Sequence, residues 1–433
     1  MLKESICSRL GDSKGTGIQK NPFFYPNENN ICIERHISTV MDTDDSIWTV
    51  LRFEENGDTH IKVYKNGREH CCVKDVGEGA AKPVIHVAAN KSIFIAWSEC
   101  SDKEWKIMCA VKENSSSVFE KYIVHSSGSL AYDPSICMFR NQLWISWCGH
   151  DSQQNNTAIF LTVFDKEICR KPIKAICGDF DAFRPSIAAG STIFVACDLY
   201  FNGTYKIAYL FVNELGNTSE LNILGSDYER WMCPKVIYGT DEKYHLVYLS
   251  VADVKDEKNG IIDHEVGVIY ALADKDGIEF LPDKSVGDGI HATKLREGLL
   301  GKEVYWGYFG SRRNFQPVIS DSGCIWLMWE FVFEKDMSQN EDKKAGNAYI
   351  SEYHCGCLAG KRFNGKAWES PVLLHEGGTL YCVPSQQSTS CIGISYINQR
   401  DILDSPKLCL EAIVTNNSKT PIVEADESWA RWK

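Results

Sequence analysis

The sequence predicts an all-β protein, a seven-bladed β-propeller built from four-stranded antiparallel blades. The first observation is a regular period, because proline heads an apolar run at Pro83, Pro134, Pro185 and Pro234, in steps of 51, 51 and 49 residues. The second is that each period contains four short β-rich runs separated by polar turns. A fixed repeat of four strands is typical of propeller blades, whose sheets bury both faces only against similar neighbours.

The four runs follow one another in the same order in each clear copy. Proline begins the first run, and the second run ends in a large or sulfur-containing side chain, as at Trp97, Trp147 and Cys197. A third, alternating run follows a polar loop, and a weaker fourth run completes the unit. Extending this template outward places the seven repeat heads near residues 37, 83, 134, 185, 234, 317 and 384, so we expect residues 1–433 to form a single propeller domain. Insertions interrupt the repeat at residues 251–263, 284–316 and 333–346.

A pair of β-sandwiches is the alternative architecture. Strands that recur every 8 to 12 residues or so also suit a sandwich. The fixed period of four strands favours the propeller, because a sandwich has no structural reason to repeat.

Composition limits the partners and the location of the protein. The formal net charge of −12 argues against nucleic acid or an anionic membrane surface as a general partner. No apolar run is long enough to span a membrane, and the first ten residues lack the apolar core of a signal peptide, so we expect a cytoplasmic location.

The 18 cysteines are expected to be reduced, buried thiols on strands rather than a disulfide framework. The close pairs Cys71-Cys72 and Cys355-Gly-Cys357 lack the spacing of a zinc site. We therefore expect no metal and no cofactor.

Positive charge gathers near the repeat heads of this acidic chain. The innermost strand of a propeller blade starts beside the axis, so the residues just before each head should form a ring around a central funnel. Guanidinium groups bind carboxylate or sulfate through two parallel hydrogen bonds, so this ring predicts a small-molecule or oligosaccharide ligand that is anionic. The alternative is that these side chains only solvate a loop face. The predicted substrate-binding residues are Arg35, Lys82, Asp181, Arg184, Arg230, Trp231, Arg312, Arg313 and Tyr381.

The same ring and the ends of the second strands supply groups for proton transfer. A carboxylate at the end of a rigid strand can act as a general acid or base when it is buried beside cations, although each one could equally cap a turn. The predicted catalytic residues are His36, Tyr132, Asp133, His150, Asp198 and Glu330.

The insertions are expected on the same face. Residues 251–263 and 333–346 are polar and predict loops. Residues 284–316 contain aromatic residues interleaved with glycine and arginine, a composition that suits stacking on a sugar ring or another flat ligand. The alternative is that the aromatic residues of this segment fill the groove between the fifth and sixth blades.

The repeat resembles a known family. Pro-Ser-Ile-Ala followed by Ile-Phe-Val-Ala and Tyr-Lys-Ile-Ala-Tyr, with Asp-Ala-Phe-Arg-Pro at residues 181–185, is similar to the sialidase-like, BNR-type propellers. That group includes glycoside hydrolases, polysaccharide lyases and lectins, and the resemblance implies the fold. The Ser-X-Asp-X-Gly-X-Thr-Trp box of true sialidases is absent, and the arginine motif stands in the fourth blade rather than the first. Seven-bladed relatives that cleave uronic-acid polysaccharides use His, Tyr and Arg at the funnel. The residues of those types here are His36, His150, Tyr132, Tyr200 and Arg184.

The leading hypothesis is a carbohydrate-active enzyme, a glycoside hydrolase or polysaccharide lyase, that acts on an anionic or oligomeric glycan in the central funnel. One alternative is a non-catalytic propeller that binds a glycan or a protein on the same face. Another is an enzyme that acts on a small intracellular metabolite. No other catalytic motif is present, neither a Gly-X-Ser-X-Gly elbow nor a phosphate-binding glycine loop.

Overall fold

The computed structural model describes residues 31–274 with short gaps at 45, 56–57, 78, 102–103, 168–169 and 257–259. It also describes residues 23–24, 277–279, 304–306, 316–319, 325–335, 354–363, 372–375, 379–384, 391–398 and 407–414, which are all strands. Side chains are described mainly between residues 37 and 252.

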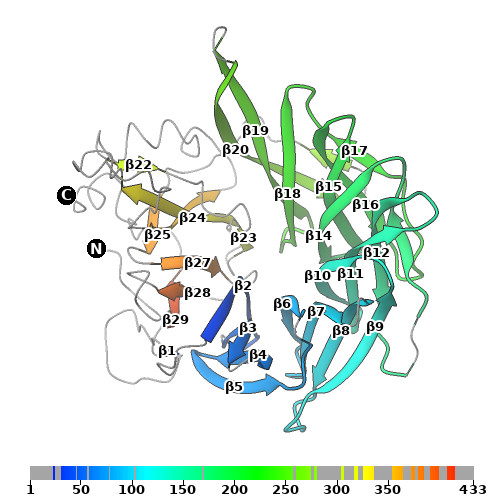
Figure 1. The fold of residues 1–433 in the computed structure, drawn as a ribbon, viewed down its shortest axis with the longest axis vertical. Helices are drawn as coiled ribbons and strands as arrows, with labels where there is room; N and C mark the ends of the chain where they lie inside the picture. Colours follow the sequence, from blue (N-terminus) through cyan, green and yellow to red (C-terminus); the bar gives the residue numbers. More distant parts are fainter. Residues whose placement is uncertain are drawn as a thin grey trace.

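The described strands form seven antiparallel sheets arranged around a common axis (Figure 1). The innermost strands are β2 (Ile31–Met41), β6 (Ala81–Val87), β10 (Ala131–Phe139), β14 (Asp181–Ala189), β18 (Glu229–Tyr238), β23 (Gln316–Ile319) and β27 (Thr379–Pro384). The second strands are β3 (Ile47–Glu55), β7 (Ile93–Ser101), β11 (Gln142–Asp151), β15 (Ile193–Phe201), β19 (Tyr244–Asp256), β24 (Ile325–Lys335) and β28 (Cys391–Asn398). The third strands are β4 (Asp58–Lys65), β8 (Glu104–Lys112), β12 (Asn156–Val163), β16 (Thr204–Val212), β20 (Gly260–Asp274), β25 (His354–Phe363) and β29 (Lys407–Val414). The outer strands are β5 (Arg68–Val73), β9 (Glu120–Ser127), β13 (Ile173–Ile176), β17 (Asn222–Leu224), β21 (Gly277–Glu279) and β26 (Val372–His375), together with β1 (Phe23–Phe24).

The innermost strands contact one another in a closed ring. β2 packs against β6, β6 against β10, and so on through β14, β18, β23 and β27, which returns to β2. Each predicted repeat head lies on one of these strands. The predicted all-β propeller of antiparallel four-stranded sheets is confirmed.

The ring is closed by strand pairing between the two ends of the chain. β1 pairs antiparallel with β29, with Phe23 opposite Leu408 and Phe24 opposite Lys407. The last sheet therefore has the order β1-β29-β28-β27, in which the N-terminal strand supplies the outer position. The backbone hydrogen bonds between β1 and β29 thus hold the first and last described strands of the propeller together.

The core lies between neighbouring sheets rather than inside one layer. Trp48 of the first blade and Trp97 of the second belong to one buried cluster, and Trp147 packs with residues of the second and third blades in another. Where side chains are described, the second strands are buried on both faces and read as continuous apolar runs instead of alternating ones, as β7 and β11 do. The aromatic residues noted in the sequence fill the spaces between twisted sheets.

A recurring serine joins successive innermost strands. The hydroxyl oxygen of Ser38 accepts a hydrogen bond from the backbone N–H of Ile85 in the next blade, at 3.3 Å. Ser135 does the same for Ile187 at 3.3 Å, and Ser186 for Val236 at 3.1 Å. Each serine directly follows the repeat head, so this bridge is a repeated contact between neighbouring blades.

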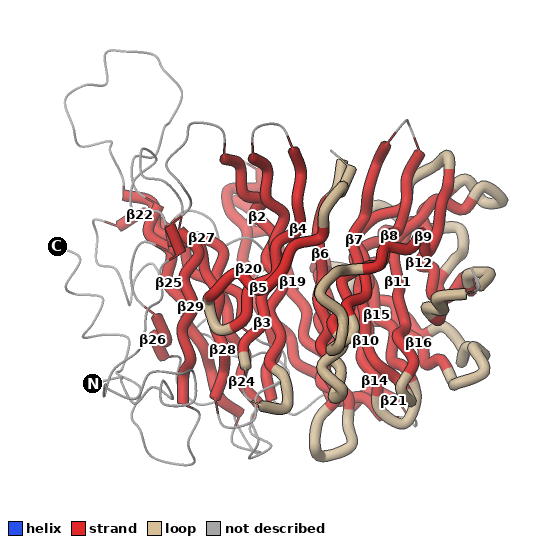
Figure 2. Tube along the Cα trace, turned by 90° about the horizontal axis from the view of Figure 1, so that it is seen from below, coloured by secondary structure: helices blue, strands red, loops and turns tan. Residues whose placement is uncertain are grey.

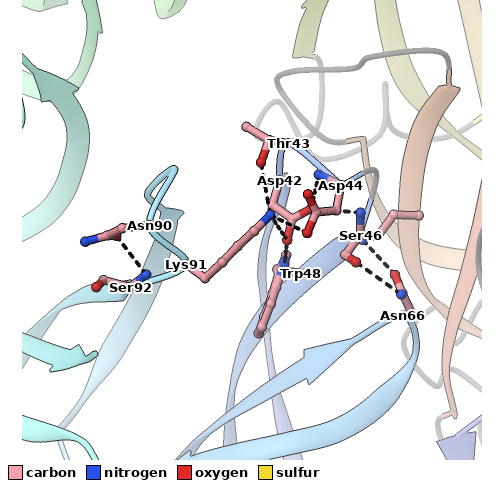
Figure 3. A network of polar contacts seen from close by, with 10 residues as sticks. Asp42, Thr43, Asp44, Ser46, Trp48, Asn66, Asn90, Lys91 and Ser92 are labelled. Carbon is pink, nitrogen blue, oxygen red and sulfur yellow. Dashed lines mark hydrogen bonds and ion pairs between the residues drawn. The ribbon is translucent and has the colours of Figure 1, made fainter. Parts of the chain in front are cut away.

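A second type of blade junction lies at the other end of the innermost strands. Figure 3 shows the buried carboxylate of Asp42, just after β2, meeting the ammonium group of Lys91, just before β7, at 3.3 Å. The Trp48 indole N–H donates to the same carboxylate at 2.9 Å. In side view the strands run between two faces of the molecule, so turns collect at both ends (Figure 2).

The first insertion differs from its prediction. Residues 251–263 were expected to form a polar loop, but β19 and β20 continue through most of this segment as a paired hairpin, with Asp253 opposite His264 and Asp256 opposite Gly260. This hairpin projects beyond its neighbours in Figure 1. The segment contains the β-branched residues Val251, Val254, Ile261 and Ile262, which favour strands although its charged residues suggest a loop.

The second insertion splits the innermost strand of its sheet. β22 (Val304–Trp306) pairs with residues 333–335 of β24, and β23 pairs with residues 325–328 of the same strand. Residues 307–315, and the third insertion beyond Lys335, lie outside the described residues. Among the described residues, no helical segment has the length and apolar character needed to cross a membrane.

Candidate functional site

The recurring prolines mark a β-bulge in the innermost strands. In the second to fifth blades, two residues of the innermost strand stand opposite one residue of the second strand. Proline has no N–H to donate to the ladder, so a bulge is one of the few positions it can occupy in a sheet. The residues opposite the four bulges are Trp97, Trp147, Cys197 and Tyr248, all fully buried.

The residue before each of these prolines adopts a left-handed backbone conformation. The φ angles are 51° at Lys82, 60° at Asp133, 49° at Arg184 and 58° at Cys233. For a residue that carries a Cβ this conformation costs about 1–2 kcal/mol. Backbone strain that recurs at equivalent positions suggests that these positions have a function. A β-bulge also commonly redirects the side chain of the residue that it contains.

The first two bulge residues pair with each other across a blade junction. The Lys82 ammonium group on β6 lies 2.5 Å from the Asp133 carboxylate on β10, and the Lys82 and Asp133 side chains are 19% and 18% exposed. The Lys82 ammonium also lies 5.5 Å from the centre of the Tyr132 ring. A largely buried pair of this kind fixes two charged groups in a partly dry environment.

The third bulge residue binds a buried carboxylate. Arg184 forms an ion pair with Asp198, whose side chain is fully buried on β15. The other carboxylate oxygen of Asp198 accepts the backbone N–H of Cys233, at 2.5 Å. Burial raises the pKa of Asp198 to about 6, although the Arg184 guanidinium and the Cys233 N–H act in the opposite direction. A carboxyl group with this pKa can exchange a proton near neutral pH.

Tyrosine side chains lie on two sides of the site, Tyr132 on one side and Tyr205 with Tyr200 on the other. Tyr132 and Cys148 are opposite each other in the β10–β11 ladder, and the Cys148 thiol donates to the Ala182 carbonyl at 3.1 Å. Burial raises the pKa of both groups, that of Cys148 to about 12. The Arg184 guanidinium lies 5.8 Å from the centre of the Tyr205 ring, which is 5.0 Å from the ring of Tyr200. Tyr200 is 40% exposed, so an aromatic surface runs outward from Arg184.

Lys235 completes the site from the fifth blade. It follows Pro234 on β18 and is half-buried. Burial lowers the pKa of its ammonium group, and it interacts electrostatically with Asp133, Cys233, Lys82 and Asp198. β6 and β18 are separated around the ring by β10 and β14, so an interaction between Lys82 and Lys235 shows that these side chains converge towards the axis.

We call this group the axial cluster. Its residues are Lys82, Tyr132, Asp133, Arg184, Asp198, Cys233 and Lys235. Three cations and two carboxylates meet here, which suits binding of an anion beside a group able to transfer a proton. Among the described residues, no three His, Cys, Asp or Glu side chains converge in a way that would hold a metal ion.

The structure places the other predicted residues elsewhere or leaves them outside the described side chains. Asp181 accepts hydrogen bonds from the Thr157 N–H and hydroxyl at 2.9 and 3.0 Å, which joins β12 to β14. His150 lies at the end of β11, opposite Thr157. Arg230 lies near the start of β18, opposite Val251.

Trp231 has a packing position. It is 7% exposed, lies 5.0 Å from the Tyr248 ring, and donates its indole N–H to Glu229 at 2.8 Å. This burial favours a role in the core between the fourth and fifth blades over contact with a ligand. The side chains of Arg35 and His36 on β2, Glu330 on β24 and Tyr381 on β27 are outside the described ones, as are residues Arg312 and Arg313.

Sequence reasoning missed Cys233, Lys235 and Tyr205. Cys233 directly precedes a repeat proline, as Lys82 does, so the rule that found the ring also predicts it. Lys235 stands where the third and fourth repeats have Ser135 and Ser186, a departure visible in the aligned copies. Tyr205 gives no such signal, because its relation to Arg184 depends on strand register.

Comparison with known proteins supports the fold. No protein-family model and no curated protein matches this sequence. Among solved structures, a polysaccharide lyase described as an ulvan lyase matches over 92% of this chain and 96% of its own, with 9% identity and a TM-score of 0.52. The Trypanosoma rangeli sialidase matches over 92% of this chain and 59% of its own, with 10% identity and a TM-score of 0.42. An α-L-arabinofuranosidase from Lactobacillus brevis covers 57% of this chain and 93% of its own, at 14% identity and a TM-score of 0.37.

At these identities the matches show the fold alone. The ulvan lyase match, whose TM-score is above 0.5, confirms the predicted resemblance at the level of the propeller fold alone.

Proposed function

We propose that this protein is a carbohydrate-active enzyme that binds an anionic glycan at the axial cluster. The observation that carries the proposal is that four successive blades use the same strained bulge to direct Lys82, Asp133, Arg184 and Cys233 to one place. A purely structural bulge would not need charged residues at the strained position. Charged residues at three of the four strained positions, Lys82, Asp133 and Arg184, support a ligand-binding role.

The proposed ligand class follows from the chemistry of the cluster and its surroundings. Cations at the axis suit a carboxylate or sulfate group. The exposed Tyr200 ring, which lies beside the half-buried Tyr205, suits the apolar face of a sugar ring. The solved structures that match the fold include enzymes named as a polysaccharide lyase, a sialidase and an arabinofuranosidase. These names lead us to expect a glycan as the ligand. The cations of the axial cluster lead us to expect that this glycan is anionic.

The reaction requires proton transfer by the buried groups. Asp198 is the best candidate, because its pKa of about 6 lets it take up and release a proton near neutral pH, and Arg184 holds its orientation. A lyase would remove the proton at C5 of a uronate while cations neutralise the carboxylate. The C4–O bond would then break as the C4–C5 double bond forms, and the leaving oxygen would take up a proton. A hydrolase would use two carboxylates, one as acid and the other as base or nucleophile, and Asp133 is the second carboxylate of the cluster.

The test is a screen of the purified protein against neutral, uronic, sulfated and sialic oligosaccharides. New reducing ends report hydrolysis, and new reducing ends together with the ultraviolet absorbance of an unsaturated uronate report a lyase. We expect cleavage of at least one anionic glycan, and Asp198→Asn should lower its kcat about 100-fold or more while the protein stays folded. The matched control is Glu99→Gln, because Glu99 is also buried on a second strand but bonds the Trp97 indole. If the Asp198→Asn protein retains wild-type kcat, proton transfer by Asp198 is excluded.

A non-catalytic glycan-binding propeller is the second candidate. It is favoured by the observation that both carboxylates of the cluster are held by cations, Asp133 by Lys82 and Asp198 by Arg184. No cleavage in the screen, combined with thermal stabilisation by one anionic glycan, would support this candidate instead.

A further inference from the structure

We infer that Lys235, rather than Arg184, is the residue that binds the anionic group of the ligand, a carboxylate or a sulfate. This inference rests on the proposed function, because it assigns the anion contact within the same axial cluster. Three observations carry it: the repeat position of Lys235, the state of the other two cations, and the surroundings of its ammonium group.

The repeat position of Lys235 is normally a structural one. In the first, third and fourth blades a serine at this position accepts a backbone N–H from the next blade. In the fifth blade lysine replaces it, and an ammonium group cannot accept a hydrogen bond. The chain gives up the bridge between blades at this junction, and a bridge of this kind contributes about 1 kcal/mol. A charged side chain that replaces a structural one beside the axis points to a role in binding.

The other cations of the cluster already have anionic partners. Lys82 lies 2.5 Å from Asp133, and Arg184 is bonded to the buried Asp198. In the part of the chain that the structure describes, no carboxylate lies within ion-pair distance of the Lys235 ammonium group, whose electrostatic interactions are longer in range. Lys235 is therefore the cation that can bind an incoming anion without breaking a pair.

The surroundings of Lys235 make such an anion favourable. The side chain is half-buried, and loss of hydration together with repulsion from Lys82 lowers the pKa of its ammonium group. An uncompensated charge in a low-dielectric site is costly, and an anion that enters the site removes that cost. A bound carboxylate or sulfate would also raise the pKa of Lys235 towards its ordinary value, because an opposite charge favours the ammonium form.

The decisive experiment measures the reactivity of Lys235 in the wild-type protein. The protein is labelled with an amine-reactive reagent at neutral pH, and each lysine is followed by mass spectrometry with and without glucuronate or inorganic sulfate. We expect at least one of the two anions to slow the labelling of Lys235 about tenfold at ten times its dissociation constant. Lys62 is the internal control, because it lies on β4 and pairs with Glu69 at 3.3 Å, and its labelling should not change. Unchanged labelling of Lys235 at saturating concentrations of both anions would overturn the inference.

A variant pair tests the same assignment by affinity. Lys235→Met should weaken binding of glucuronate or sulfate by at least about tenfold, and Lys235→Arg should retain most of it, because only the arginine keeps the charge. Equal affinity of the Lys235→Met and wild-type proteins would contradict the inference.

The two proposals can fail separately. If the anion protects Lys235 but no glycan is cleaved, the anion site stands and the enzyme does not. If an anionic glycan is cleaved by the Lys235→Met protein with an unchanged KM, the enzyme stands and the assignment of Lys235 is wrong.

Discussion

Two buried carboxylates join neighbouring blades at opposite ends of the innermost strands, and they are held differently. Asp42 accepts hydrogen bonds from the backbone N–H groups of Asp44 and Ser46 at 2.8 and 3.0 Å and from the Trp48 indole at 2.9 Å, and it faces Lys91 (Figure 3). Among the residues that the structure describes, the donors to Asp198 are the Cys233 N–H and the Arg184 guanidinium.

The balance between burial and the surrounding donors decides the ionisation of each group. Burial raises the pKa of Asp42, but the Trp48 indole, the two backbone N–H groups and Lys91 outweigh it, so the pKa falls below its ordinary value. At Asp198 burial prevails, and the pKa rises to about 6. Asp42 is thus an ionised structural contact at neutral pH, whereas Asp198 can carry a proton. A buried ion pair alone therefore does not reveal whether a carboxylate stabilises the fold or takes part in chemistry.

The largest effect predicted from this comparison is at Asp42. Asp42→Asn should lower the free energy of unfolding by about 3–5 kcal/mol, because it breaks a buried pair and leaves donors without an acceptor. Chemical denaturation measures the loss. Asp44→Asn is the matched control: Asp44 also pairs with Lys91, at 2.7 Å, but its side chain is 66% exposed, so the change should be about 0–1 kcal/mol. Equal losses in the two variants would refute the difference in burial as the cause.

The second prediction concerns pH. Between about pH 4 and pH 6 the folded protein keeps a proton on Asp198 that the unfolded chain has released, so stability falls as pH rises through this window. Asp42 acts in the opposite sense, because its pKa is lowered in the folded state and its contribution is lost as pH falls below about 4.

The measurement is the free energy of unfolding of the wild-type and Asp198→Asn proteins across this pH range. The wild-type protein should lose on the order of 2 kcal/mol relative to the variant as pH rises from 4 to 7. A constant difference between the two curves would show that the pKa of Asp198 is not raised.

The architecture could be predicted from the sequence because it is repeated. Several copies share a proline at a regular period, a pattern of four strands, and buried residues at fixed offsets, such as Trp97 and Trp147. An accidental match in one copy therefore does not change the predicted fold. The position of Lys82, Asp133 and Arg184 beside the axis follows from the same period. Closure by β1 could not be predicted, because a two-residue strand carries no periodic signal.

The interaction partners of the site residues could not be predicted from the sequence. Arg184 was expected to bind a ligand anion, yet it pairs with Asp198, and this pairing depends on the bulge that turns its side chain. Trp231 is predicted to contact a ligand, and the sequence does not show that it is 7% exposed and packs in the core between the fourth and fifth blades. The repeat predicts the position of a residue along its blade. The side-chain contacts of that residue depend on the residues of neighbouring strands and blades, which the repeat does not predict.

The smallest predicted effect tests whether the blade junction beside Asp198 controls its proton. Ser186→Ala removes the hydrogen bond to Val236, which is three residues beyond the Cys233 N–H that bonds Asp198. Ser38→Ala removes the same bridge between the first two blades, to Ile85, and neither blade carries a described donor to Asp198. Both variants should lose about 1 kcal/mol of stability. Only Ser186→Ala should also shift the titration of Asp198, which carbon-labelled aspartate followed by NMR measures, because only this bridge holds the donor in place. Equal titration curves in the two variants would mean that β15 and Arg184 fix the pKa of Asp198 without help from the fifth blade.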